Sequence, residues 1–315
     1  MPRKPLPNEG AGDRRPSSSP SYSSGSDVGA LVDAATHLRA LTRSQGTLIR
    51  RLLREKTVRS QEQAFVVEGA KSCLDLITRH ARSIRSLVLS PHYLRTETDA
   101  DRHVRSQLSA SQFICPDSVF DKLSDVGTPQ GMLAVVRQPR WDEAQIFNRA
   151  KVLGIYADRL QDPANVGAII RTAAALNLSG VWLSAECADP FNPKVVRASA
   201  GSLLNLPVFE GREFLTFSSY GCEIYSAVLP SAGIVSIRTI QQIPGRLMIA
   251  LGNEGTGLAP DVVTASHVKF CIPLADGMES LNVAATAAIS TFYFSGLPFD
   301  SMVEGGESST GCRDI

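Results

Sequence analysis

The second half of the chain alternates apolar runs with amphipathic segments, and this alternation is the strongest constraint on its fold. Apolar runs at 152–156 and 247–251 predict buried strands, and the segment 163–176 predicts a helix. Strands that alternate with helices form a mainly parallel sheet covered on both faces, and ligands bind beyond the carboxyl ends of its strands. The sequence therefore predicts an α/β fold. Further strands are expected at 181–184, 207–209, 223–229 and 268–273, and further helices at 193–203, 213–219 and 282–294.

The first half of the chain predicts a second, smaller α/β domain, which a length of 315 residues allows. Its strands are expected at 64–68, 84–89, 113–115 and 132–136, and its helices at 70–79 and 118–123. Residues rich in Pro, Ser, Gly and charge, as at the N-terminus, bury too little apolar surface to order themselves. The predicted segments are a disordered tail at 1–30, a domain at 31–138, a linker at 139–150, a domain at 151–298 and a disordered tail at 299–315.

Composition argues against several classes of protein. No apolar run approaches the roughly 20 residues that span a bilayer, and the first 30 residues contain no apolar signal segment. The six cysteines form no CxxC pair and no Cys/His cluster, which favours reduced thiols over a metal site. We therefore expect a cytoplasmic protein without a metal. Arg and Ser near the N-terminus leave import into an organelle open, although Glu9 and Asp13 argue against it.

Charge is distributed unevenly along the chain. Residues 1–140 carry 21 Lys and Arg against 14 Asp and Glu, a net charge of +7, whereas residues 141–315 carry 11 against 17, a net charge of −6. Leu48, Ile49, Leu52 and Leu53 have the spacing of an apolar helical stripe, which predicts a helix ahead of the one at 70–79. Many of the cations lie in this first helix, where they could follow phosphates or simply be solvated, and charge alone does not decide. Aromatic residues for base stacking are scarce there. The candidate phosphate-binding residues are Arg43, Arg50, Arg51, Arg54, Lys56 and Arg59.

A glycine-rich turn follows the apolar run at 247–251. Residues 252–257 read Gly-Asn-Glu-Gly-Thr-Gly. Three glycines let the backbone turn sharply and approach a ligand closely, but neither the P-loop pattern nor GxGxxG is present. Glu254 would repel a phosphate, so the turn suits a neutral or cationic ligand. A plain tight turn between a strand and a helix is the alternative.

Two polar residues stand out on the helix expected at 163–176. Arg171 falls between its apolar positions, where it could clamp a phosphate or carboxylate, or pair with a surface carboxylate. Asn165 lies in the first turn, after Asp162 as N-cap and Pro163 as first helical residue. Asn165 and Arg171 are roughly 9 Å apart along the axis and about 120° apart around it. The helix alone therefore does not bring them together.

A third polar stretch, Ser280-Leu281-Asn282, precedes the helix expected at 282–294. Ser280 is a candidate helix N-cap, which would be a purely structural role. The small residues that follow would allow very close packing of another backbone. Because each of the three stretches joins a strand to a helix in one fold, we expect one composite site.

In this order, the three stretches resemble the motifs of the SpoU/TrmH family of SPOUT-class RNA ribose 2′-O-methyltransferases. The resemblance covers residues 152–295, with support from 192–201 and 272–273. Residues 43–136 also resemble the family's ribosomal-protein-like substrate-binding domain, through Phe-Val-Val-Glu-Gly at 65–69 and Thr-Pro-Gln-Gly at 128–131. The resemblance implies S-adenosylmethionine as cofactor, RNA as substrate and a homodimer that completes the site. It also implies a parallel sheet threaded into a trefoil knot, which sequence rules would never predict.

The resemblance implies roles for single residues as well. The sulfonium of the cofactor is cationic, in agreement with a glycine turn that carries Glu254. The family proposal makes its motif arginine, here Arg171, the group that activates the ribose hydroxyl. Because a guanidinium is a poor base, we favour Arg171 as a phosphate clamp that stabilises the developing alkoxide, and we leave the general base open. The implied active-site residues are Asn165, Arg171, Glu254, Ser280 and Asn282, and the implied cofactor-binding residues are Leu251, Gly252, Asn253, Gly257, Ile272, Leu281 and Val283.

Ribosomal RNA is the favoured substrate, because a full N-terminal domain is commoner in the family's ribosomal RNA enzymes than in its tRNA enzymes. A tRNA ribose 2′-O-methyltransferase is the main alternative. A non-catalytic RNA-binding protein of the same fold is another, although all the motif side chains are present. A nicotinamide-dependent oxidoreductase is disfavoured by the missing dinucleotide fingerprint. The sequence does not distinguish housekeeping modification from antibiotic resistance, and it does not show the target nucleotide.

Overall fold

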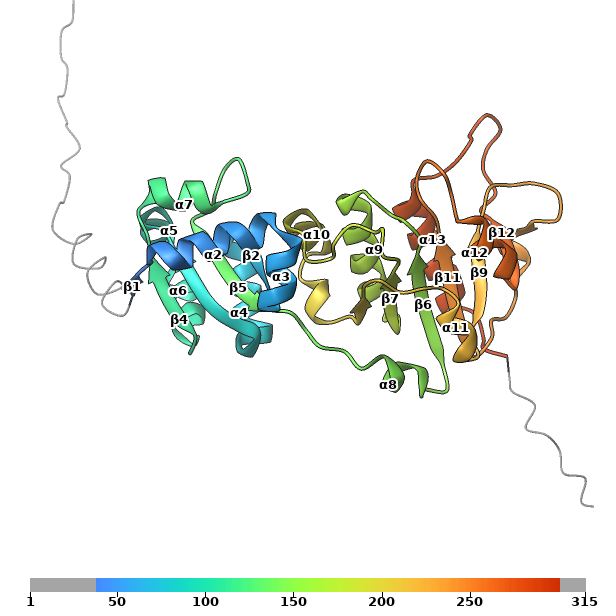
Figure 1. The fold of residues 1–315 in the computed structure, drawn as a ribbon, viewed down its shortest axis with the longest axis horizontal. Helices are drawn as coiled ribbons and strands as arrows, with labels where there is room; N and C mark the ends of the chain where they lie inside the picture. The colour runs from blue at the N-terminus through green and yellow to red at the C-terminus, as the bar shows by residue number, and fades with distance from the viewer. Residues whose placement is uncertain (1–37, 301–315) are drawn as a thin grey trace, which may run out of the picture. The chain divides into compact units, whose positions relative to one another are not determined.

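The computed structural model describes residues 38–300, and in this range the chain builds two sheets (Figure 1). We call the five-stranded sheet with its helices the N-lobe, and the seven-stranded sheet with its helices the C-lobe. The expected α/β fold is confirmed. The predicted tail at 1–30 and residues 301–315 of the second tail lie outside the described residues. The described end of the second tail is held in place, since the Asp300 N–H donates to the Ile243 carbonyl at 2.7 Å.

The sheet of the N-lobe is mixed, because β5 runs antiparallel to both of its neighbours while the other pairs are parallel. In spatial order its strands are β1 (Arg39–Ala40), β4 (Ser111–Ile114), β3 (Ile84–Leu89), β5 (Met132–Arg137) and β2 (Ala64–Glu68). Its helices are α2 (Arg43–Arg54), α3 (Lys56–Glu62), α4 (Ala70–His80), α5 (Pro91–Thr96), α6 (Asp99–Ser106) and α7 (Asp117–Leu123), with a 3₁₀ turn, η1, at Ala81–Ser83.

The cationic segment near the start of the N-lobe is two helices rather than the single one that the sequence predicted. Thr42 caps α2 in a reciprocal capping box with Gln45. Glu55 adopts an extended backbone, φ −110° and ψ 114°, so α2 ends there and α3 starts in a new direction. The apolar stripe of α2 packs inward through Ile49, Leu52 and Leu53, as its spacing predicted.

Every strand pair in the C-lobe sheet is parallel. The spatial order is β10 (Val235–Ser236), β12 (Val268–Cys271), β9 (Glu223–Ala227), β11 (Arg246–Leu251), β6 (Val152–Ala157), β7 (Gly180–Leu183) and β8 (Val208–Phe209). Neighbouring strands β11 and β6 are fully buried along most of their length, as the apolar runs predicted. The threading of this lobe into a knot stays a prediction.

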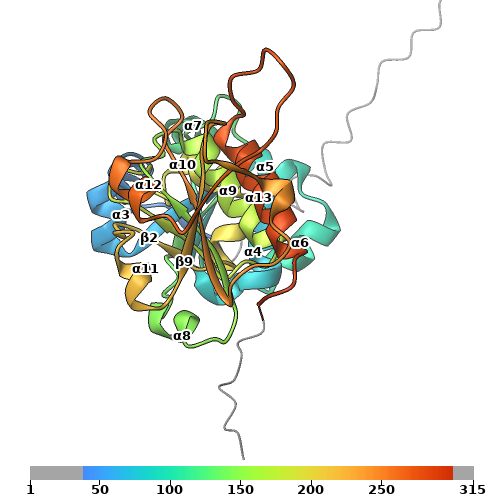
Figure 2. The same ribbon diagram turned by 90° about the vertical axis from the view of Figure 1, so that its right-hand side faces the viewer.

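Helices cover both faces of the C-lobe sheet (Figure 2). One face carries α9 (Pro163–Ala175) and α13 (Val283–Ser295), and α10 (Pro193–Ser199) packs on α9. A Cβ on Gly167 of α9 would lie 2.4 Å from the Ala198 Cβ, so glycine is required for this close packing. The opposite face carries α11 (Thr216–Ser219) and α12 (Pro260–Ala265). The sequence missed α12 and overestimated α10 and α11; a 3₁₀ turn, η2 (Ser202–Leu204), replaces the end of the predicted helix at 193–203.

The predicted linker at 139–150 packs onto the C-lobe. It contains α8 (Glu143–Phe147), whose Ile146 and Phe147 enter the core with Trp182. The Trp182 indole N–H donates to Glu143 Oε1 at 2.7 Å. The segment packs on the C-lobe instead of forming a free linker because burial of its apolar side chains is favourable. The predicted domain boundaries themselves stay predictions.

The two lobes also meet directly, through α10 and β2. The Phe65 and Phe191 rings lie 5.2 Å apart across this contact. Beside them Arg59 is only 3% exposed, and its Nε donates to Asp189 Oδ2 at 2.7 Å. A buried ion pair of this kind needs tight geometry to offset desolvation, so it fixes how the lobes pack.

No helix within residues 38–300 is long and apolar enough to cross a bilayer.

Candidate functional site

The structure joins the three polar stretches of the C-lobe by hydrogen bonds between side chains. Asn165 Nδ2 donates to Glu254 Oε1 at 2.8 Å, and Asn282 Nδ2 donates to Asn165 Oδ1 at 3.0 Å. We call these three residues the carboxamide cluster. Asn165 is 8% exposed, and its oxygen and nitrogen each have a partner, as buried polar groups require. The stretches therefore converge, as the expectation of one composite site required.

Each member of the carboxamide cluster is placed by the end of a regular element. Asn165 lies in the first turn of α9, which Asp162 caps by accepting from the Ala164 N–H at 2.9 Å. Asn282 caps α13, because its Oδ1 accepts from the N–H groups of Ala284 at 2.9 Å and Ala285 at 3.3 Å. Asn282 thus takes the capping role that the sequence gave as a candidate role to Ser280. The Asn282 side-chain oxygen therefore caps α13, and the side-chain nitrogen joins the carboxamide cluster.

The glycine turn that carries Glu254 is closed by its own backbone. The Asn253 N–H donates to the Gly257 carbonyl at 3.1 Å, and the Gly257 N–H donates back at 2.9 Å. Asn253 Oδ1 accepts from the N–H of Gly255 at 2.9 Å. A Cβ on Gly252 would lie 2.2 Å from the Leu258 nitrogen, so only glycine fits where the two ends of the turn meet. The glycines are therefore needed to close the turn, whatever ligand it serves.

Two residues that the sequence analysis missed hold this turn from the neighbouring strand. Asp158, 4% exposed at the end of β6, accepts the Ala259 N–H with Oδ2 at 2.7 Å. Arg159 Nη2 donates to the Gly257 carbonyl at 3.1 Å, and the Arg159 carbonyl accepts from Asn253 Nδ2 at 2.8 Å. The hydrogen bond to Asp158 raises the pKa of the Arg159 guanidinium. The available signal was a charged pair directly after a buried strand.

Of the remaining predicted cofactor residues, two lie at the carboxyl ends of strands of one sheet and two lie at the start of α13. Leu251 ends β11 and is buried, whereas Ile272 follows β12 and is half-buried. Both strands pair with β9, which lies between them. Leu281 is half-buried and Val283 begins α13 as a buried residue, while Ser280 is exposed. The positions of Leu251 and Ile272 follow the general rule for ligand sites in parallel sheets.

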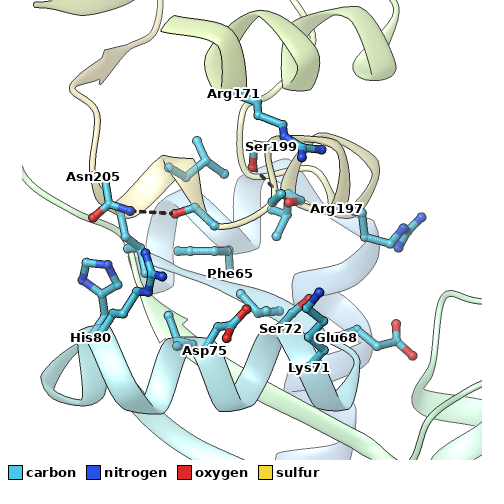
Figure 3. A pocket seen from close by; sticks show the side chains of 18 residues that line it. Phe65, Glu68, Lys71, Ser72, Asp75, His80, Arg171, Arg197, Ser199 and Asn205 are labelled. Atoms are coloured by element: carbon cyan, nitrogen blue, oxygen red, sulfur yellow. Dashed lines mark hydrogen bonds between the residues drawn. The ribbon is translucent and has the colours of Figure 1, made fainter. Parts of the chain in front are cut away.

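Arg171 lies apart from the carboxamide cluster. It is exposed on α9 and lines a cavity of about 460 Å³ between the lobes, together with residues of α4 and α10 (Figure 3). The 120° turn between Asn165 and Arg171 therefore separates two environments, as the helix geometry indicated. Within one chain the structure brings together Asn165, Glu254 and Asn282, but not Arg171.

The six cations proposed to bind phosphate fall into two groups. Arg43, Arg50 and Arg54 are exposed on α2. The others are paired: Arg51 with Glu55 at 3.0 Å, Lys56 with Glu210 at 2.9 Å, and Arg59 with Asp189 in the interior. Because the Arg59 side chain is enclosed, it cannot reach an RNA phosphate from outside, and we leave it out of the proposed RNA surface. Among residues 38–300, no group of three or more His, Cys, Asp or Glu is arranged to hold a metal ion.

Comparisons with known proteins agree with this architecture. Residues 153–292 match the SpoU rRNA Methylase family, and residues 49–134 match an MRM3-like substrate binding domain. The chain is 29% identical to the 23S rRNA (guanosine(2553)-2′-O)-methyltransferase of Bacillus subtilis, over 78% of this chain and 93% of that protein.

Two solved structures extend the likeness over most of the chain. A TrmH-family protein from Porphyromonas gingivalis is 30% identical, with a TM-score of 0.66 over 81% of this chain and 98% of that one. An AdoMet-bound rRNA methyltransferase from Sinorhizobium meliloti is 25% identical, with a TM-score of 0.68 over 81% of this chain and 95% of that one. Both lobes and all three motif stretches fall inside these matches, and the chain belongs to the SpoU/TrmH methyltransferase family.

Proposed function

We propose that this chain transfers the methyl group of S-adenosylmethionine to a ribose 2′-hydroxyl of ribosomal RNA. The observation that carries the proposal is the carboxamide cluster, which joins the three family motifs at the carboxyl edge of the C-lobe sheet. Two relationships support the substrate and cofactor. The Bacillus subtilis relative is a 23S rRNA methyltransferase, and the Sinorhizobium meliloti structure is that of an AdoMet-bound rRNA methyltransferase.

The residues around the glycine turn fit a cofactor that carries a sulfonium cation. Glu254 places an exposed carboxylate at the turn, with one oxygen held by Asn165. No cationic side chain belongs to the turn itself, so a positive ligand is favoured over a phosphate. When bound, the cofactor supplies a methyl group activated by the positive charge on sulfur. The residues proposed to hold it are Leu251, Gly252, Asn253, Gly257, Ile272, Leu281 and Val283.

The protein's own part in the reaction is alignment and electrostatic stabilisation. Holding a hydroxyl in line with a methyl group can lower the barrier by about 7–11 kcal/mol. We assign Arg171 to a phosphate of the RNA and to the negative charge that develops on the ribose oxygen. Asn165 and Asn282 fix Glu254 and the start of α13, and the exposed Ser280 hydroxyl is free to contact ligand. The group that removes the proton stays open.

We further propose that two copies of the chain complete one site. Arg171 does not reach the carboxamide cluster within one chain, so a second copy is a natural source of the missing group. In addition, α13 carries no charged side chain on any face, and Phe292 and Ile289 are 71% and 42% exposed on it. A helix of this kind is normally buried. The Phe292→Asp variant is expected to sediment as a monomer, whereas Leu215→Asp, on the opposite face of the sheet, should leave the dimer intact; a monomeric parent protein would contradict the proposal.

The exposed cations Arg43, Arg50 and Arg54 on α2 are proposed to guide RNA toward the site. Because the named bacterial relative modifies 23S rRNA, we place the enzyme in the cytoplasm, where ribosomal RNA is made in bacteria. Within residues 38–300 we find no feature that favours tRNA as the substrate.

The direct test combines labelling with mapping. Purified protein, methyl-labelled S-adenosylmethionine and total RNA from cells that lack the protein are incubated, and 2′-O-methylated positions are mapped in rRNA and tRNA. We expect label on one or a few riboses of ribosomal RNA that are modified in cells containing the protein. Label confined to tRNA would change the substrate, and no label while the cofactor demonstrably binds would remove the catalytic proposal.

A further inference from the structure

The cavity between the lobes combines residues of the family resemblance, namely Arg171 and part of 192–201, with N-lobe residues to which no role has yet been given. Its N-lobe wall is formed by α4 and the end of β2, and its C-lobe wall by α10, η2 and the side chain of Arg171 (Figure 3). Its volume of about 460 Å³ falls in the range of roughly 300–1,000 Å³ that is typical of small-ligand pockets. The buried Arg59–Asp189 pair and the Phe65–Phe191 contact hold the two walls together. The cavity is therefore a fixed feature of the interface between the lobes.

Unpaired cations face this cavity from both lobes. Lys71 and Arg79 come from α4, and Arg171 comes from α9. Within residues 38–300 no carboxylate lies within ion-pair distance of any of the three, whereas Arg197, on the same rim, pairs with Asp125 at 3.3 Å. Guanidinium and ammonium groups without an intrachain anion are suited to a phosphate ligand.

The cavity also offers polar groups for a ligand less simple than phosphate. The Nε2 atom of His80 is buried and has no hydrogen-bond partner among the described residues. In Figure 3 His80 and Asn205 lie at the same end of the cavity. Glu68 is already engaged, because it accepts from the Ser124 hydroxyl and the Asp125 N–H, but Asp75 is exposed and faces the cavity. An orphaned buried nitrogen beside amide and carboxylate groups indicates a partner with its own donors and acceptors.

Apolar side chains form the wall between these groups. Leu76 of α4 and Val196 and Leu203 of the C-lobe line the cavity and are mostly buried. The cavity thus combines a cationic rim, an apolar wall and a few polar groups at one end. A nucleotide has the same three parts: a phosphate, a flat ring with apolar faces, and a polar base edge.

We propose that this cavity receives one unpaired nucleotide of the RNA substrate. Its phosphate contacts Lys71, Arg79 and Arg171, its base lies against the apolar wall, and its base edge meets His80 and Asn205. Proteins read RNA sequence chiefly on unstacked bases of single-stranded segments, so α4 becomes an element of substrate selection. The inference rests on the proposed RNA methyltransferase function, and it names where a nucleotide of that RNA is recognised.

Charge reversal on α4 tests the phosphate contact. The Lys71→Glu/Arg79→Glu double variant is compared with Arg82→Glu, an exposed arginine just beyond α4 that does not line the cavity. The probe is a fluorescein-labelled single-stranded RNA 12-mer of mixed sequence, titrated by anisotropy at several salt concentrations. We expect the double variant to bind about tenfold or more weakly, with a shallower salt dependence, since two phosphate-contacting charges are lost. Arg82→Glu should change the Kd less than about twofold.

Filling the cavity separates nucleotide insertion from simple surface attraction. Ser72→Trp places a large side chain at the cavity, and Thr78→Trp places the same side chain on α4 outside it. Net charge is unchanged in both. We expect Ser72→Trp to weaken RNA binding and raise the KM for ribosomal RNA about tenfold, with the Kd for S-adenosylmethionine unchanged, and Thr78→Trp to resemble the parent protein. Equal affinities for the two tryptophan variants would overturn the proposal, even if the charge variants bind weakly.

These experiments distinguish a failure of the proposed nucleotide site from a failure of the proposed methyltransferase function. If the parent protein binds S-adenosylmethionine and methylates ribosomal RNA while all the α4 variants match it, the nucleotide site is wrong and the function stands. If the parent methylates no RNA but α4 variants lose RNA binding, the nucleotide site stands without catalysis. Melting temperatures of all variants, measured beside the parent, exclude a general loss of structure.

Discussion

The carboxamide cluster and the cavity between the lobes both draw on α9, yet they are in opposite chemical states. In the cluster, Asn165 meets Glu254 and Asn282 through well-formed hydrogen bonds of 2.8 and 3.0 Å. At the cavity, Arg171 and Lys71 lack an ion-pair partner among residues 38–300, and His80 Nε2 lacks any hydrogen-bond partner there. One side of the helix is satisfied from within the chain, and the other is left with unused donors.

This difference indicates which kind of ligand each region is suited to bind. A satisfied cluster costs little to maintain and is already in position, which suits a small cofactor that must be held in one geometry. Unpaired cations are costly to gather unless an anion arrives, which suits a phosphate-bearing substrate. The six-residue spacing between Asn165 and Arg171 therefore places the proposed cofactor site and the proposed phosphate site on different sides of α9.

Removing the buried Arg59–Asp189 ion pair between the lobes is expected to have the largest effect. Arg59→Met leaves Asp189 buried without its partner, and removing one member of a buried pair typically costs about 3–5 kcal/mol. The free energy of unfolding, measured by denaturant titration, should fall by that amount, and RNA binding should weaken because the cavity walls separate.

The matched control for this variant is Lys56→Met, on the same helix as Arg59. Lys56 pairs with Glu210 at 2.9 Å but is half exposed, and exposed pairs contribute about 0–1 kcal/mol. Similar losses of stability in the two variants would show that the Arg59 pair does not hold the lobes together.

Removing the guanidinium from the open side should mainly affect turnover. Arg171→Ala is expected to lower kcat by about 100- to 1,000-fold, the usual effect of losing one electrostatic contact to a developing negative charge. The Kd for S-adenosylmethionine should stay unchanged in calorimetry, because Arg171 lies outside the carboxamide cluster. Arg149→Ala, an exposed arginine elsewhere, serves as the control. Near-normal turnover of Arg171→Ala with saturating RNA and cofactor would remove this arginine from the mechanism.

The sequence predicted the satisfied region better than the open one. The apolar run before Gly252 and the cap and proline before Asn165 are local signals, and they correctly placed the end of β11 and the start of α9. The cavity depends on how α4 packs against α10, which no local pattern records. The same holds for Arg59, which the sequence predicted to contact phosphate. In the structure the helix breaks at Glu55, and Arg59 points inward and pairs with Asp189. Side chains that depend on distant partners are the ones that sequence patterns misassign.

The smallest effect should distinguish the charge of Glu254 from its hydrogen bond. Glu254→Gln keeps an oxygen that can accept from Asn165 Nδ2, so the carboxamide cluster should remain intact. It removes the negative charge that faces a sulfonium. A pair of unit charges about 4 Å apart gains roughly 1–4 kcal/mol, depending on solvent exposure, and Glu254 is exposed, which favours the lower end.

Calorimetry with two cofactor forms makes this prediction sharp. The Kd for S-adenosylmethionine should rise about tenfold in Glu254→Gln, equivalent to about 1.4 kcal/mol, while the Kd for neutral-sulfur S-adenosylhomocysteine should change little. Glu279→Gln, an exposed carboxylate ahead of Ser280, is the control and should affect neither ligand. Equal weakening of both ligands would mean that Glu254 shapes the turn rather than attracting the cation. The satisfied side of α9 would then be a scaffold only, and the charge selectivity of the site would have to come from the open side.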